Sequence, residues 1–186
     1  MHLVRNIKGQ SEPVSGDAFR SAMRNLAGGV SIIASGKGEE RRGLTVTAVT
    51  AVTSTPPTVA VFVNQSAEAH QVIQSSRAFC VNLLSVDHVE EASLFSGQRG
   101  LKGAIRFKPD QWDCLATGSP ALNTAVANID CELIECIGLG SHTMFLGQVV
   151  ETRCEEDRSP LLYLRAAYHS AQTFTATPKP QQQDKT

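Results

Sequence analysis

Hydroxyl side chains recur in the segment GLTVTAVTAVTSTPPTVAVFVNQS, residues 43–66, which is otherwise typical of a buried β-strand region. Thr45 and Thr47 alternate with Val46 and Ala48, so two hydroxyls lie on one face of the predicted strand. The alternation slips at Ala48–Val49, as it does at a bulge or a strand end, and a slip leaves backbone N–H groups free. Hydroxyls and free N–H groups beside an apolar wall form a candidate site for a polar ligand. The alternative is that the threonines are ordinary strand residues on a solvent-exposed face of the sheet.

Other reactive residue types lack the spacing of catalytic or metal sites. No GxSxG turn is present, and GKGEERRG and GLGSH do not fit the GxGxxG dinucleotide fingerprint. The five histidines show no HExxH or similar ligand spacing, so we predict no metal site. The five cysteines contain no CxxC pair and indicate reduced, mostly buried thiols rather than a disulfide or metal framework.

Composition favours one domain with its own core. The chain has 186 residues, of which 41% are hydrophobic and 19% charged, with a formal net charge of −1. This balance disfavours disorder and gives no electrostatic reason to expect a nucleic-acid partner. The N-terminus lacks a continuous apolar stretch, and no segment approaches the roughly 18 apolar residues of a membrane span. We therefore expect a cytoplasmic protein without a membrane segment.

Periodicity predicts a mostly β fold with two or three helices. Phe19, Ala22, Met23 and Leu26 predict a short amphipathic helix, with Asp17 as a possible cap. Ser66 is the expected cap of a second helix at 67–76, a weaker helix is expected at 87–96, and a long ordered loop at 97–119. About seven strands, mostly antiparallel, suit a small barrel decorated with helices. The strands are expected at 30–35, from 44 onward, and at 58–63, 78–84, 126–137, 143–154 and 160–170.

Several motifs follow one another in a characteristic order: GLTVTAVTAVTSTPPTVAVFVN, FCVNLLS, an RF pair, GSPAL, GSHTMFLGQV and PLLYLRAAYH. Together they resemble the small flavin reductase family, the reductase components of two-component monooxygenases that act on hydroxyphenylacetate, chlorophenols and pyrimidines. The resemblance implies an FMN-binding split β-barrel, which we place at residues 15–172. The polar, unpatterned composition of the two ends predicts flexible arms at 1–14 and 173–186. The resemblance also implies a homodimer that reduces FMN or FAD with NADH or NADPH and hands the reduced flavin to a separate oxygenase.

The resemblance also implies the site residues. Thr45, Val46, Thr47 and Ala48 would meet the flavin ring, and Asn64, Gln65 and Ser66 its phosphate, because a helix N-terminus favours an anion. Further flavin-site residues are expected at Ser54, Arg106 and Phe107, and Tyr168 resembles a family aromatic residue near the nicotinamide. His142, in a Gly140-Ser141-His142 turn, is the expected catalytic residue at the nicotinamide. The middle residue of this turn, often Asp or Thr in the family, is a serine here, so an acidic partner at that position is absent.

Most of these residues could also have roles unrelated to ligand binding. Arg106 could be a solvated loop charge, Phe107 a core plug, Tyr168 a buried barrel residue, and His142 a surface turn histidine. Arg41 and Arg42 could meet a 2′-phosphate of NADPH or be plain loop charges.

At the level of function, three rivals to the reductase are a non-catalytic flavin carrier or sensor, a barrel of the pyridoxamine-phosphate-oxidase type, and a structural dimerisation barrel. The family resemblance alone favours NADH over NADPH as the electron donor.

Overall fold

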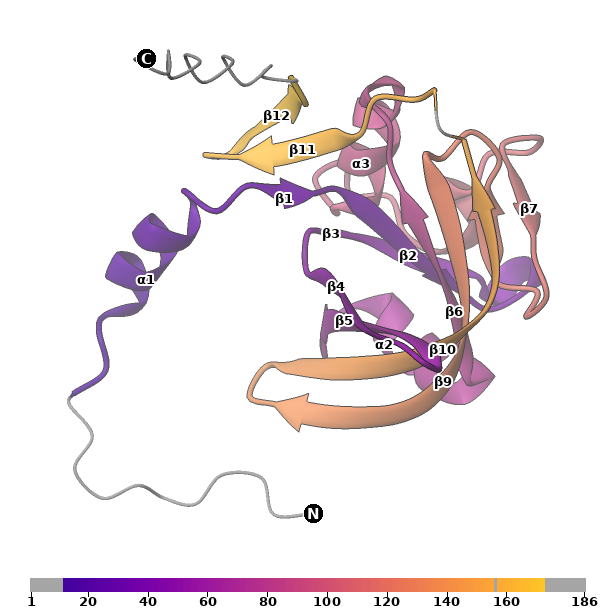
Figure 1. The fold of residues 1–186 in the computed structure, drawn as a ribbon, viewed down its shortest axis with the longest axis horizontal. Coiled ribbons are helices and arrows are strands. Elements are labelled where there is room, and N and C mark those ends of the chain that lie inside the picture. The colour runs from indigo at the N-terminus through magenta and orange to yellow at the C-terminus, as the bar shows by residue number, and fades with distance from the viewer. Residues whose placement is uncertain (1–11, 156, 173–186) are drawn as a thin grey trace, which may run out of the picture.

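A seven-stranded antiparallel sheet forms the body of the protein, in the order β3-β2-β6-β9-β10-β5-β4 (Figure 1). The computed structural model describes residues 12–155 and 157–172. The expectation of a mostly β, antiparallel fold is confirmed. The strands of this sheet are β2 (Ser31–Ser35), β3 (Arg42–Val46), β4 (Val49–Ser54), β5 (Pro57–Asn64), β6 (Ala78–Leu83), β9 (Ala127–Leu139) and β10 (His142–Cys154).

The sheet curls into a barrel that stays open along one seam. Its two edge strands, β3 and β4, follow each other directly in the chain and are joined only by Thr47 and Ala48. They do not pair with each other: β3 pairs with β2, and β4 pairs with β5. The Phe62 N–H donates to the Ala48 carbonyl at 3.2 Å, which fastens the connection to β5. The predicted slip at Ala48–Val49 is therefore the split of the barrel, and the split-barrel prediction is confirmed.

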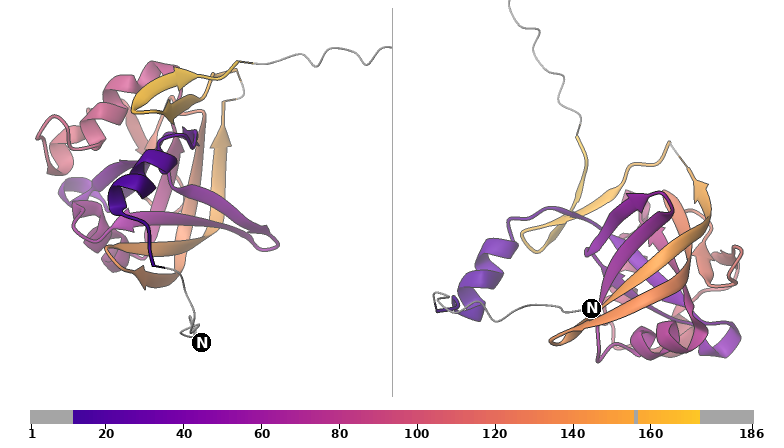
Figure 2. Two further views of the ribbon diagram at one scale, coloured as in Figure 1. Left: turned by 90° about the vertical axis from the view of Figure 1, so that its left-hand side faces the viewer. Right: turned by 60° about the horizontal axis from the view of Figure 1, so that its bottom comes forward.

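Two smaller sheets and three helices surround the barrel. α2 and α3 lie against it, whereas α1 lies apart (Figure 2). The turn of the β11–β12 hairpin holds the C-terminal end of α1, because the Arg165 N–H donates to the Arg24 carbonyl at 2.9 Å. The helices are α1 (Gly16–Met23), α2 (Glu68–Ser76) and α3 (Val89–Phe95), with single 3₁₀ turns at Gly38–Glu40, Val86–His88 and Gly103–Arg106. One small sheet contains β1 (Gly28–Gly29), β11 (Leu161–Leu164) and β12 (Ala167–Ser170), and the other β7 (Trp112–Cys114) and β8 (Pro120–Leu122).

β2 separates two hydrophobic cores and is buried on both faces. Ile33 points into the barrel, where it joins a cluster with residues such as Phe79 and Phe145. Ile32, on the opposite face, joins a second cluster with Phe95 and Phe107 that lies beneath α3. A strand covered on both sides needs apolar residues at every position, which explains why VSIIAS shows no polar alternation.

Several local predictions were wrong. Ser15, not Asp17, caps α1, since its hydroxyl accepts from the Ala18 N–H. Residues 160–170 form two strands rather than one, because Arg165 and Ala166 both take positive φ and make a tight turn. Three of the five cysteines are exposed, and only Cys80 and Cys131 are buried.

The described residues contain neither a membrane-spanning helix nor a metal-binding cluster. No helix in them is long and apolar enough to cross a membrane. Within 12–155 and 157–172, no group of three or more His, Cys, Asp or Glu side chains is arranged to hold a metal ion. The predicted terminal arms fall mostly outside the described residues.

Gly147 is the position where the barrel tolerates no side chain. It lies at the register shift of β10 against β9, and a Cβ there would stand 2.5 Å from the Phe79 ring and 2.7 Å from the Cys131 Cβ. Gly147→Ala should therefore lower the free energy of unfolding by about 1–3 kcal/mol through overpacking, measured by urea denaturation. Gly138→Ala, on the same hairpin with no atom within 4 Å of a built Cβ, is the control and should change stability by less than about 0.5 kcal/mol. Equal effects of the two variants would contradict the packing argument.

Candidate functional site

Three adjoining hollows form a groove beside β3 and the open seam, which we call the seam groove. A central hollow of about 210 Å³ shares Thr45 and Ser96 with a loop hollow of about 300 Å³ on one side. On the other side it shares Thr47 and Tyr163 with a helix hollow of about 630 Å³ beside α1. The central and loop hollows together reach the range of roughly 300–1,000 Å³ in which small-molecule sites usually fall.

The central hollow combines an apolar wall with hydroxyl and amide groups. Its lining residues are Val30, Thr45, Val46, Thr47, Ser96, Gln98, Tyr163 and Tyr168. The rings of Tyr163 and Tyr168 meet edge to face at 5.4 Å. Burial, with a smaller effect of Tyr163, raises the pKa of the Tyr168 phenol, so this hydroxyl remains a hydrogen-bond donor at neutral pH.

The two threonines of the central hollow differ in what they already bind. The Thr45 hydroxyl donates to the Ala92 carbonyl of α3 at 2.7 Å, and its side chain is half-buried. Thr47 is exposed, and its hydroxyl has no hydrogen-bond partner among the described residues. Thr47 can therefore donate its hydroxyl to a ligand, whereas the Thr45 hydroxyl is already used in a hydrogen bond that links β3 to α3.

The loop hollow lies between β3, the start of α2 and the loop at 96–106. Glu68 joins these elements, because its Oε2 accepts from the Gly103 N–H and from Arg106 Nη2, both at 3.2 Å. Arg106 is only 5% exposed, and its guanidinium stacks on the Phe95 ring at 4.9 Å. Burial lowers the pKa of Arg106, and the nearby Glu68 charge opposes this shift. Arg106 is thus a buried, paired cation and not a solvated loop charge.

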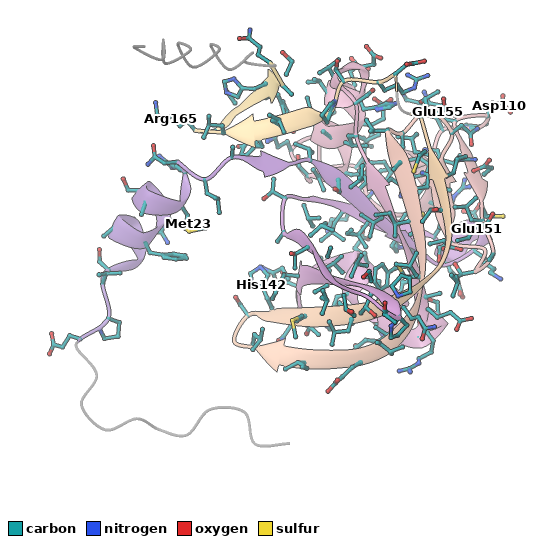
Figure 3. The ribbon with its side chains drawn as sticks, in the orientation of Figure 1. Met23, Asp110, His142, Glu151, Glu155 and Arg165 are labelled. Atoms are coloured by element: carbon teal, nitrogen blue, oxygen red, sulfur yellow. The ribbon has the colours of Figure 1, made fainter. Side chains whose placement is uncertain are left out.

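The helix hollow combines an apolar helix face with cations. Arg20, Arg24 and Arg165 line it, together with Phe19, Met23 and Leu26 of the α1 segment. No residue of α1 itself is buried. Figure 3 shows Met23, Arg165 and His142 on one side of the molecule, each from a separate element.

Asn64, Gln65, Ser66 and His142 are brought together at one end of the barrel. His142 pairs with Asn64 across β10 and β5, and the Gln65 side chain donates to the His142 carbonyl at 3.3 Å. The Ser141 hydroxyl lies 2.9 Å from His142 Nδ1, and His142 is exposed, with no hydrogen bond from its Nε2 to a described residue. Ser66 also lines the loop hollow, which links this turn to the seam groove.

Ser66 does not cap its helix as predicted. Its hydroxyl donates to Asn64 Oδ1 at 2.8 Å, and Ala67 occupies the N-cap position of α2 without a side-chain hydrogen bond. The prediction failed because α2 begins at Glu68, one residue later than expected, so Ser66 lies one position before the N-cap.

Some predicted residues lie elsewhere. Ser54 lies at the turn end of β4, away from the walls of the three hollows. Phe107 is buried against Phe95 and Trp112, which makes it a plug of the outer core. Arg41 and Arg42 are engaged by the chain itself: Arg41 stacks on Phe107, and Arg42 donates to the Glu39 carbonyl at 2.7 Å. Four residues that line the groove were not predicted from the sequence: Ser96, Gln98, Lys102 and Tyr163. The first three lie in or next to an irregular loop without a sequence pattern, and Tyr163 pairs across the hairpin with Tyr168, which was predicted.

The groove fits a flat ligand with an anionic tail. The central hollow offers aromatic and aliphatic surface beside hydroxyl and amide groups, which suits an aromatic ring system with polar edges. The loop hollow offers the Ser66 hydroxyl, the start of α2 and the Lys102 cation, beside the Glu68–Arg106 ion pair, which suits a phosphate. Fold and groove together define a split-barrel protein whose seam groove suits an elongated aromatic phosphate.

The chain belongs to the family described as "Flavin reductase like domain", whose model matches residues 23–172. FMN reductase (NADH) RutF of Serratia proteamaculans is 37% identical over 161 residues, covering 87% of this chain and 91% of that protein. The reductase component of 4-hydroxyphenylacetate 3-monooxygenase from Pseudomonas aeruginosa is 33% identical over 155 residues, covering 83% and 91%. The family expected from the sequence motifs is confirmed.

Solved structures agree with this family. Flavin reductase PheA2 superposes with a TM-score of 0.76 and 31% identity, covering 86% of this chain and all of that one. The styrene monooxygenase flavin reductase of Pseudomonas putida S12 gives a TM-score of 0.73 and 27% identity, covering 84% and 99%. The predicted enzyme class, a flavin reductase, is confirmed.

The unequal surroundings of Thr45 and Thr47 lead to separate expectations for their valine variants. Thr47→Val should weaken FMN binding by about 0.5–1.5 kcal/mol, through loss of one hydrogen bond, and leave stability unchanged. Thr45→Val should lower the free energy of unfolding by a similar amount, because the Ala92 carbonyl loses a donor. Fluorescence titration with FMN and urea denaturation measure the two effects. Thr50→Val, on exposed β4, is the control. If Thr47→Val leaves FMN affinity unchanged, Thr47 is an ordinary strand residue and does not bind the flavin.

Proposed function

We propose that this flavin reductase oxidises NADH, reduces FMN or FAD bound in the seam groove, and releases the reduced flavin to a separate monooxygenase. The observation that carries the proposal is the groove itself. It lies at the open seam of a split barrel, joins an aromatic hollow to a cationic one, and occurs in a member of the flavin reductase family. Relatives named as NADH-dependent FMN reductase and as a monooxygenase reductase component support the choice of donor and partner.

The chain's part in catalysis is to position two rings. A bound flavin supplies the hydride-accepting chemistry. Holding two reacting rings at roughly 3–3.5 Å removes much of the entropic barrier, so no nucleophile or metal is required of the protein. Val46, Tyr163 and Tyr168 provide the packing surface, and Thr47 and Gln98 provide polar contacts at the ring edge.

His142 is our proposed residue for the nicotinamide side. It lies at the tip of the β9–β10 hairpin, and the Ser141 hydroxyl at Nδ1 orients its ring so that Nε2 is available as a donor or acceptor. A serine fills the position that is often acidic in the family, so the ring is oriented here by a neutral hydroxyl rather than by a salt bridge.

We also propose that the protein works as a homodimer in the cytoplasm. α1 and the turn that follows it present an apolar face, with Phe19 57%, Met23 45% and Leu26 66% exposed. A helix whose apolar face stays largely exposed gains stability when a second copy covers it. Three exposed free thiols, Cys114, Cys136 and Cys154, suit a reducing compartment.

Turnover with free flavins tests the reductase against its rivals. Purified protein mixed with NADH and FMN, FAD or riboflavin should consume NADH only when a flavin is present, as followed by NADH absorbance. Binding of flavin without NADH consumption would favour a carrier or sensor. Tightly bound flavin that NADH cannot reduce would favour an oxidase of the pyridoxamine-phosphate type. If the protein binds no flavin at all, the structural dimerisation barrel is the better explanation.

His142→Ala should raise the KM for NADH or slow hydride transfer, while FMN affinity stays within a few-fold of wild type. The physical reason is that only the imidazole is lost, since the backbone carbonyl that accepts from Gln65 remains. Stopped-flow flavin reduction and FMN titration separate the two effects. Leu139→Ala, which removes the residue paired with His142 across the same turn, is the control. Equal loss of FMN binding would show that the turn is misassigned.

A further inference from the structure

The loop at residues 97–108 carries four cations, and three of them pair with carboxylates of the described residues. The paired ones are Arg99 with Glu90, Arg106 with Glu68, and Lys108 with Glu91. Among the described residues, Lys102 forms no ion pair. It is exposed, and it lines the loop hollow together with Ser66. Lys102 is therefore the cation of the loop hollow that is free to bind a ligand.

The backbone holds Lys102 at this place. The residue that follows it, Gly103, donates its N–H to Glu68 Oε2 at 3.2 Å, and the same oxygen accepts from Arg106. Gly97, Gly100 and Gly103 all adopt positive φ, which bends the loop around the hollow. Arg106 neutralises Glu68, so the carboxylate on the wall of the hollow does not cancel the charge of Lys102.

We infer that Lys102 binds the phosphate of the flavin tail and thereby makes the enzyme prefer FMN and FAD to riboflavin. The central and loop hollows share Thr45 and Ser96, so a ring in the first hollow directs its tail into the second. Riboflavin has the same ring and ribityl chain but no phosphate. An ammonium group facing a phosphate adds a charge-assisted contact that riboflavin cannot make. This inference rests on the proposed binding of flavin in the seam groove.

Binding of FMN and riboflavin to Lys102→Met tests the inference, with flavin fluorescence as the readout. Methionine keeps a long, flexible side chain and removes the charge. The dissociation constant for FMN should rise by about tenfold or more, and that for riboflavin should change by less than about twofold. Lys102→Arg should restore most of the FMN affinity, because a cation returns to the same place. Raised salt should weaken FMN binding to wild type more than to Lys102→Met.

Lys37→Met is the matched control. Lys37 lines a separate hollow between the Gly38–Glu40 turn and α2, so its loss removes one positive charge but should leave FMN binding unchanged. Unchanged FMN affinity in Lys102→Met, or an equal loss for riboflavin, would overturn the inference even if NADH consumption persists. If wild type discriminates FMN from riboflavin through Lys102 but consumes no NADH, the inference stands and the proposed turnover fails.

Discussion

The open seam between β3 and β4 is the constraint on which the rest of the molecule depends. These edge strands are consecutive in the chain and joined by only Thr47 and Ala48, yet β3 pairs with β2 and β4 pairs with β5, so the two do not pair with each other. An unpaired sheet edge normally invites another strand or a ligand. Here the second core, α3 and the 96–106 loop cover part of the edge, and the seam groove occupies what is left.

Glu68 links the groove to the rest of the fold. It begins α2, and one of its carboxylate oxygens binds both the Gly103 N–H and the Arg106 guanidinium. Arg106 in turn stacks on Phe95, whose ring belongs to the core beneath α3. A buried guanidinium is costly to desolvate unless it is paired, so the Glu68 partner is what allows Arg106 to fill this place. The loop that carries Lys102 is thereby positioned by buried structure, while Lys102 itself stays accessible.

Sequence reasoning found the elements whose signals are local. The loss of alternation at Ala48–Val49 marked the seam, and the paired prolines marked the turn after β4, because both follow from residues that are neighbours in the chain. The Arg165–Ala166 turn was missed because neither residue is a usual one for positive φ. The choice between Arg106 and Lys102 as the free cation could not be made, since it depends on Glu68, which lies 38 residues before Arg106.

The exposure of the groove decides what kind of binding it can support. Thr47 and Lys102 are exposed, and Thr45, Tyr163 and Tyr168 are half-buried, so ligand contacts form without burying many unpaired polar groups of the protein. Such contacts give moderate affinity, because water competes for each of them. A reductase that passes its reduced flavin to another protein needs a ligand that can leave. The same open seam that prevents β3 from pairing with β4 therefore also keeps the site accessible for release.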